Sequence, residues 1–157
     1  MTTEEPPPST DRLLAATLFN QVWELIEQPD RTRDDDDRML HMAHASRHHW
    51  GAVGTAANVA RGEWQCSRVY AVLRRPEPCL HHAQRMLDLC TENDIKDWDL
   101  AFAHEAIARA YAIAGDAQAA KREIDKALAV DIAADDDRAL LLADLGTIPG
   151  QGPGPVI

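Results

Sequence analysis

The sequence predicts an all-α protein made of stacked antiparallel helix hairpins with a C-terminal capping helix. The chain has 157 residues, of which 26 are alanines, and alanine is the best helix former and a weak strand former. Apolar residues recur at helical spacing, as in Leu14, Leu18 and Val22. Glycine and proline are concentrated in the tails and between the periodic segments.

Seven helices are expected in order along the chain. Ser9 or Thr10 can cap the first helix, and aspartate runs open the second and the seventh, where their charge offsets the positive helix N-terminus. Gly62 lies inside the third helix at a cost of about 1 kcal/mol relative to alanine, so we expect a close neighbour there. The expected helices cover residues 11–28, 34–51, 56–75, 79–90, 98–114, 117–130 and 135–145.

One domain over residues 10–146 is expected between two tails. Residues 1–9 read as a disordered tail and residues 147–157 as a flexible one, because both are rich in proline or glycine. The opening "MTTEEPPPST" lacks the apolar region of a signal peptide, and no run of about 18 apolar residues exists to span a membrane. A cytoplasmic location is therefore expected.

The net charge of the chain argues against two classes of partner, and its cysteines show no motif of a functional site. The 26 acidic residues exceed the 16 basic ones and give a formal net charge of −10. This argues against nucleic acid and against an anionic membrane surface, since both require a basic footprint. The three cysteines show no CxxC spacing and are expected to be free buried thiols. No motif implies a cofactor.

A repeat of about 37 residues is visible in the second helix of each expected pair, where a small side chain is followed by a large one and then by a small or medium one. The segment 97–134 resembles the tetratricopeptide repeat, a helix pair with small residues where the helices touch. It departs from that pattern at His104 and Ile132. The resemblance implies stacked hairpins whose apolar stripes bury one another. The residues that carry it are Ala108, Tyr111, Gly115, Ala120, Ile124 and Ala127, then Ala71, Ala83, Leu87 and Cys90, then Ser46, Trp50 and Val53.

The stretch "HMAHASRHHW" at 41–50 contains four of the seven histidines. At about 100° per residue, His41, His44 and His48 share a face with Asp37, opposite the apolar face, so a solvated helix face is expected. The alternative is a metal site, because His44 and His48 at i, i+4 can turn toward one ion, joined by Asp37 or His41. His82, on the fourth helix, is also expected to be exposed but would lie near enough to complete such a site.

Glu105 and Arg109 form an i, i+4 pair in the otherwise apolar segment "AFAHEAIARAYA". Charges there are costly unless they are paired or used, so the pair is either a structural salt bridge or part of a site. In tetratricopeptide proteins the first helix of each pair lines a concave groove, and the resemblance places a set of residues from this sequence there. The set comprises Asn58, Arg61, Gln65, Arg68, Phe102, Glu105 and Arg109.

A binding module is the function that these patterns predict. A mostly polar groove with several arginines would bind a peptide, a protein or a small acidic ligand, because arginine forks match carboxylates and phosphates. The alternative is a metal-binding or metal-dependent protein that uses the histidines of residues 41–48. An enzyme that uses Glu105 as acid or base is the least favoured of the three.

Overall fold

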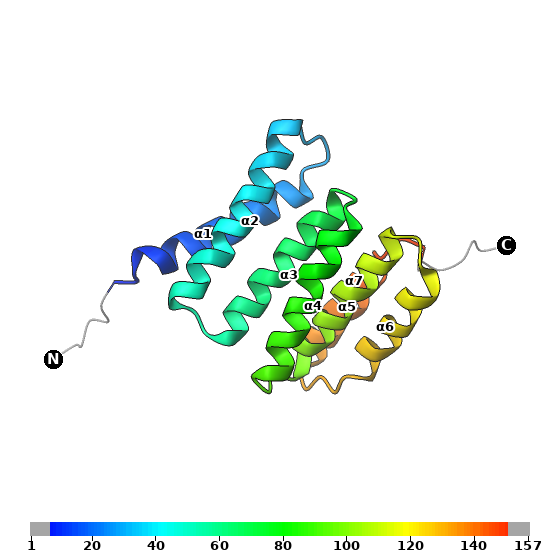
Figure 1. Ribbon diagram of the computed structural model, residues 1–157. Coiled ribbons are helices and arrows are strands. Elements are labelled where there is room, and N and C mark those ends of the chain that lie inside the picture. The colour runs from blue at the N-terminus through cyan, green and yellow to red at the C-terminus, as the bar shows by residue number, and fades with distance from the viewer. Residues whose placement is uncertain (1–6, 151–157) are drawn as a thin grey trace.

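The computed structural model describes residues 7–150 and is all-helical (Figure 1). No strand occurs in this range, so the predicted fold class is confirmed at the level of an all-α protein. The outer parts of both predicted tails, residues 1–6 and 151–157, lie outside the described residues. The seven helices are α1 (Thr10–Glu27), α2 (Arg33–Val53), α3 (Ala56–Val72), α4 (Pro76–Glu92), α5 (Asp97–Ile113), α6 (Ala117–Ala129) and α7 (Asp135–Leu145).

Most helices begin at side-chain caps. The hydroxyl oxygens of Ser9, Thr32 and Thr55 accept hydrogen bonds from backbone N–H groups in the first turns of α1, α2 and α3. The carboxylate of Asp116 accepts the equivalent hydrogen bond at the start of α6. Asp116 follows Gly115, whose φ of 85° favours glycine. These caps satisfy N–H groups that a helix leaves without partners, and they explain why the chain turns where it does.

The first six helices form three packed pairs, each made of two helices that follow one another along the chain. α1 lies against α2, α3 against α4 and α5 against α6, and the pairs are joined through α2–α3 and α4–α5 (Figure 1). The odd-numbered helices also touch one another, α1 with α3, α3 with α5 and α5 with α7. We call α1, α3, α5 and α7 the odd-numbered layer, and one face of the molecule is built from it.

Small residues allow close approach between the helices. A Cβ atom added at Gly62 would lie 3.0 Å from Cδ and 3.3 Å from Cα of Arg47, so the expected close neighbour of this glycine is the backbone of α2. Ser46 is fully buried and donates a hydrogen bond of 2.7 Å to the carbonyl oxygen of Ala15. α2 also continues through Gly51, where the sequence predicts its end, and stops before Gly54.

α7 packs on α5 in the odd-numbered layer (Figure 1). Its Leu141 and Leu145 are buried in a core cluster with alanines of α5 and α6. Ile148, which the sequence places in the flexible tail, is only 2% exposed and joins the same cluster. The packed part of the chain therefore extends past residue 146, because an apolar side chain beyond the helix closes the end of the core.

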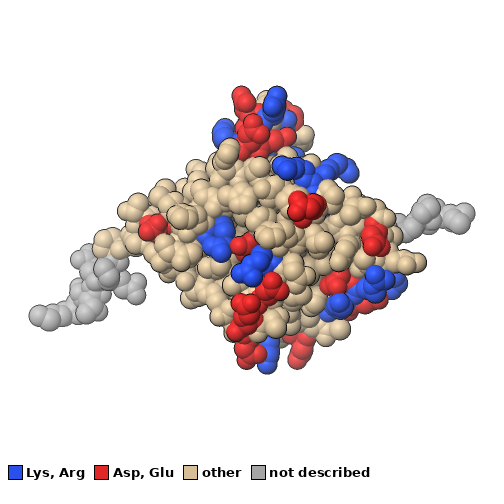
Figure 2. All heavy atoms as spheres, in the orientation of Figure 1, with Lys and Arg blue, Asp and Glu red and all other residues tan. Residues whose placement is uncertain are grey.

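Charged side chains of both signs gather at the end of the molecule formed by the α1–α2 turn (Figure 2). Arg31 pairs with Asp36 at 2.8 Å, and Arg38 approaches Asp35 at 3.7 Å. Asp35 also closes a capping box with Thr32. The aspartate run thus stabilises the start of α2, as predicted from its position.

The three cysteines, Cys66, Cys79 and Cys90, are free and buried, as the sequence predicts. Burial raises the pKa of Cys66 to about 12 and that of Cys90 to about 11, so these thiols stay protonated at neutral pH. Among the helices of residues 7–150, none is both long and apolar enough to cross a membrane.

Candidate functional site: an aromatic pocket

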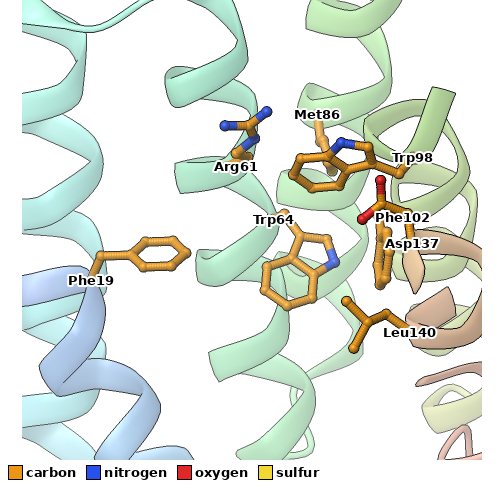
Figure 3. Close-up of a pocket in the computed structure, with 8 residues that line it drawn as sticks. All are labelled: Phe19, Arg61, Trp64, Met86, Trp98, Phe102, Asp137 and Leu140. Carbon is orange, nitrogen blue, oxygen red and sulfur yellow. The ribbon is translucent and has the colours of Figure 1, made fainter. Parts of the chain in front are cut away.

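A cavity of about 290 Å³ opens on the odd-numbered layer. Side chains from α1, α3, α5 and α7 converge on it from different sides, and Met86 of α4 also lines it (Figure 3). All but two of these side chains are apolar. We call this cavity the aromatic pocket, and its lining consists of Phe19, Arg61, Trp64, Met86, Trp98, Phe102, Asp137 and Leu140.

The aromatic rings of the pocket stand edge to face. The centroids of Trp64 and Phe102 lie 6.0 Å apart with the planes at 88°, and those of Trp98 and Phe102 lie 6.3 Å apart at 83°. Trp23 of α1 lies 5.5 Å from Trp64 on another side. Such pairs contribute about 0.5–1.5 kcal/mol each beyond their buried area, so the rings form a preformed wall.

Arg61 holds the upper wall of the pocket in place. Its guanidinium lies over the ring of Trp98, 4.4 Å from the centroid. It also donates two hydrogen bonds of 3.0 Å to the two carboxylate oxygens of Asp99, which is 5% exposed. The hydrogen bonds with Asp99 raise the pKa of Arg61. The positive charge of Arg61 is therefore already matched by a carboxylate of the protein.

A charged cluster lies behind the aromatic wall and contains Glu105, Arg68, Arg109 and Asp144, which we call the Glu105 cluster. Glu105 is fully buried and accepts hydrogen bonds from Nε1 of Trp64 (3.2 Å), from Arg68 (3.2 Å) and from Arg109 (2.9 Å). Burial raises the pKa of the Glu105 carboxyl group, and the two arginines oppose that shift. Arg68 pairs in addition with Asp144 of α7.

The C-terminal end of α7 covers the Glu105 cluster. Arg109 donates to the carbonyl oxygen of Asp144 (3.0 Å) and to the hydroxyl of Thr147 (2.8 Å). Only 8% of the Arg109 side chain and 11% of the Arg68 side chain are exposed. Two arginines and two carboxylates therefore balance one another, and the cluster touches the aromatic pocket through the hydrogen bond from Trp64 to Glu105.

The predicted groove residues lie in four different places. Arg61 and Phe102 line the aromatic pocket, whereas Arg68, Glu105 and Arg109 belong to the Glu105 cluster. Gln65 is fully buried and donates 2.9 Å to the carbonyl oxygen of Phe19, while its Oε1 has no hydrogen-bond partner among the described residues. Asn58 completes the capping box of Thr55 at the start of α3. The aromatic pocket is therefore mostly apolar, whereas Arg68 and Arg109 line a second cavity of about 280 Å³, where carboxylates of the protein pair with them.

Sequence reasoning missed most of the pocket, although a signal for it exists. Only eight residues of the chain are aromatic, four Trp, two Tyr and two Phe. Phe19 with Trp23, and Trp98 with Phe102, are spaced i, i+4 on α1 and α5, so each pair lies on one helix face. With Trp64 on α3, they belong to the first helices of three successive hairpins. The residues not predicted are Phe19, Trp64, Met86, Trp98, Asp137 and Leu140.

The structure covers one part of the predicted histidine face and leaves the rest exposed. His44 does not face away from the core as predicted: its Nε2 lies 2.9 Å from the hydroxyl of Tyr70, and its ring is 5.2 Å from that of His82. His82 is not exposed either, because its Nδ1 bonds Glu63 at 2.6 Å and its ring stacks on Tyr70. The physical reason is that each of the two helices is covered on two sides, α2 by α1 and α3, and α4 by α3 and α5.

The other candidate metal ligands remain at the surface. Asp37, His41 and His48 are exposed, and His49 bonds Asp11 of α1 at 2.7 Å. Over residues 7–150, no group of three or more His, Cys, Asp or Glu side chains is placed to hold a metal ion. The structure thus brings His44 and His82 together without a third ligand.

His44 gives a testable pH dependence. Burial lowers its pKa below the usual 6.5, and the charge of His82 acts in the same direction while Glu63 opposes it. Cys66 and Tyr70 of α3 also face this ring, and His41 lies near it on α2. Because the folded protein binds this proton less tightly than the unfolded chain, the contribution of His44 to stability is fully present above about pH 6.5 and is lost as the pH falls.

We therefore expect the stability advantage of wild type over His44→Gln to shrink between about pH 7.5 and pH 5.5. Urea unfolding followed by circular dichroism at both pH values measures it. His48→Gln, at an exposed position of the same helix, is the control and should differ from wild type equally at both. An advantage over His44→Gln that does not change with pH would contradict the expectation.

No family model matches the sequence, and no curated protein matches it. The geometry of the aromatic pocket is therefore the feature of this chain that bears most directly on its function.

Proposed function

We propose that this protein is a helical-repeat binding module that takes a bulky apolar side chain of a peptide or protein partner into the aromatic pocket. The observation that carries the proposal is an open cavity lined by two tryptophans and two phenylalanines in a chain with eight aromatic residues. Elsewhere the helices pack mainly through alanine and other small residues. Aromatic-walled cavities are typical of sites where a partner's anchor residue binds.

The pattern of small residues supports a tetratricopeptide-like arrangement within this proposal. Ser46, Ala83 and Ala120, which are equivalent in the repeat, are all fully buried. The pocket is formed mainly by the first helices of successive hairpins, the position where that family presents its groove. Apolar shape, rather than arginine pairing, would then select the partner, because Arg61, Arg68 and Arg109 are already bound to carboxylates of the protein.

Leu140 and Leu142 provide a matched test. Both lie on α7 and are strongly exposed, at 63% and 51%, but only Leu140 lines the pocket. Peptides are selected from a random display library on the wild-type protein, and their affinities are then measured by fluorescence polarisation. We expect Leu140→Asp to weaken binding of the selected peptides by about tenfold or more, since a charge at the mouth of an apolar site is costly.

Leu142→Asp should bind the same peptides as tightly as wild type, and both variants should unfold at the wild-type temperature because neither leucine is buried. The selected peptides should share a bulky apolar residue, and its replacement by alanine should abolish binding. Peptides that lose affinity equally with both variants, or a selection that enriches no apolar residue, would refute the proposed site.

A further inference from the structure

The mouth of the aromatic pocket carries negative charge that the protein leaves unmatched. Asp137, in the first turn of α7, lines the pocket beside Leu140, and Asp135 and Asp136 precede it. Within residues 7–150, no ion pair involves any of these three aspartates. The other carboxylates near the pocket differ in this respect, because Asp99, Glu105 and Asp144 are each paired with arginine.

The positive end of the α7 helix dipole offsets only part of this negative charge. The N-terminus of a helix corresponds to about half a positive charge, whereas the first turn of α7 carries three carboxylates. Among the described residues, Arg61 is the only basic one that lines the pocket, and Asp99 holds its guanidinium through both carboxylate oxygens. The whole chain has a net charge of −10. The field at the pocket mouth therefore favours a positively charged partner.

We infer, building on the proposed function, that the pocket binds a basic peptide segment in which a lysine or arginine next to the apolar anchor pairs with Asp137. The anchor enters the cavity between Phe19 on one side and Trp64, Trp98 and Phe102 on the other, whose positions are shown in Figure 3. The cationic side chain remains at the rim, where it meets the α7 carboxylates. The apolar anchor supplies affinity, and the charge pair sets the orientation of the segment and the preference among peptides with similar anchors.

The test uses the peptides selected on wild-type protein from the unbiased library. These should carry lysine or arginine close to the apolar residue, and replacing that basic residue by glutamate should weaken binding by about tenfold at low salt, where charges are least screened. The double variant Asp136→Asn/Asp137→Asn should reduce this difference to about twofold. The control Asp34→Asn/Asp37→Asn removes the same charge from exposed positions at the start of α2 and should leave the tenfold difference unchanged.

The outcomes separate this inference from the proposed function. If selected peptides depend on Leu140 but contain no basic residue, or if the glutamate versions bind equally well, the pocket stands and the basic-segment inference is overturned. A loss of the lysine preference in both double variants would show an effect of net charge and would also overturn it. If no peptide depends on Leu140, the proposed function itself fails.

Discussion

Glu105→Ala is expected to lower the free energy of unfolding by about 3–5 kcal/mol, the usual cost of leaving a buried charge without its partner. The variant would leave Arg68 and Arg109 with one carboxylate, Asp144, between them, although both side chains are nearly buried. It would also remove the acceptor of the Trp64 N–H group. Urea unfolding followed by circular dichroism measures the loss.

The double variant Glu105→Ala/Arg109→Ala tests the cause of that loss. It leaves Arg68 and Asp144 as one balanced pair, so its cost should be smaller than the sum of the two single costs, by about 1–3 kcal/mol of coupling. Lys121→Ala and Asp125→Ala, an exposed i, i+4 pair on α6, form the matched cycle and should show little coupling. Additive costs at Glu105 and Arg109 would mean that lost packing, and not charge balance, explains the effect.

Met86→Ala is expected to destabilise the protein by about 2–5 kcal/mol, as is typical for truncating a buried methionine. Met86 is 1% exposed, packs in a cluster with Ala60, Cys90 and Ala103, and lies at the base of the aromatic pocket. Its removal would deepen the pocket and take contacts away from the aromatic wall. Thermal unfolding monitored by circular dichroism measures the effect.

The enlarged pocket should also bind small apolar molecules. Indole should raise the unfolding temperature of Met86→Ala more than that of wild type, because a cavity with apolar walls binds such ligands. Met42→Ala, at a half-buried position on α2, should cost less and gain nothing from indole. Equal stabilisation of all three proteins by indole would show that the methionine does not border the binding cavity.

The helices were predictable because each one carries its own local signals. The caps Ser9, Thr55 and Asp116 and the turn at Gly115 are short-range features, and hydrogen bonds within three residues decide them. The close approach at Gly62 was also predictable, since a glycine inside a helix has a cost that packing must offset.

The positions of the histidines and of the groove required information that no single helix contains. Helical periodicity gives one buried face, but α2 is covered by two neighbours, so His44 meets Tyr70 although it shares a face with exposed His41. Similarly, the sequence indicated that Glu105 and Arg109 were exceptional. It did not indicate that Asp144, 35 residues beyond Arg109, would come back over them.

The Glu105 cluster also limits how the length of this protein can change. Repeat proteins are commonly lengthened or shortened by whole hairpins, because each unit contacts only its neighbours. Here Arg68, Glu105 with Arg109, and Asp144 come from α3, α5 and α7, so three successive units share one set of balanced charges. A hairpin inserted between α3 and α7 would move Arg68 or Asp144 away from the Glu105–Arg109 pair and leave the charges of the cluster unbalanced. Electrostatics therefore opposes a change in the number of helices between Arg68 and Asp144, whereas the α1–α2 pair contributes no charge to the cluster.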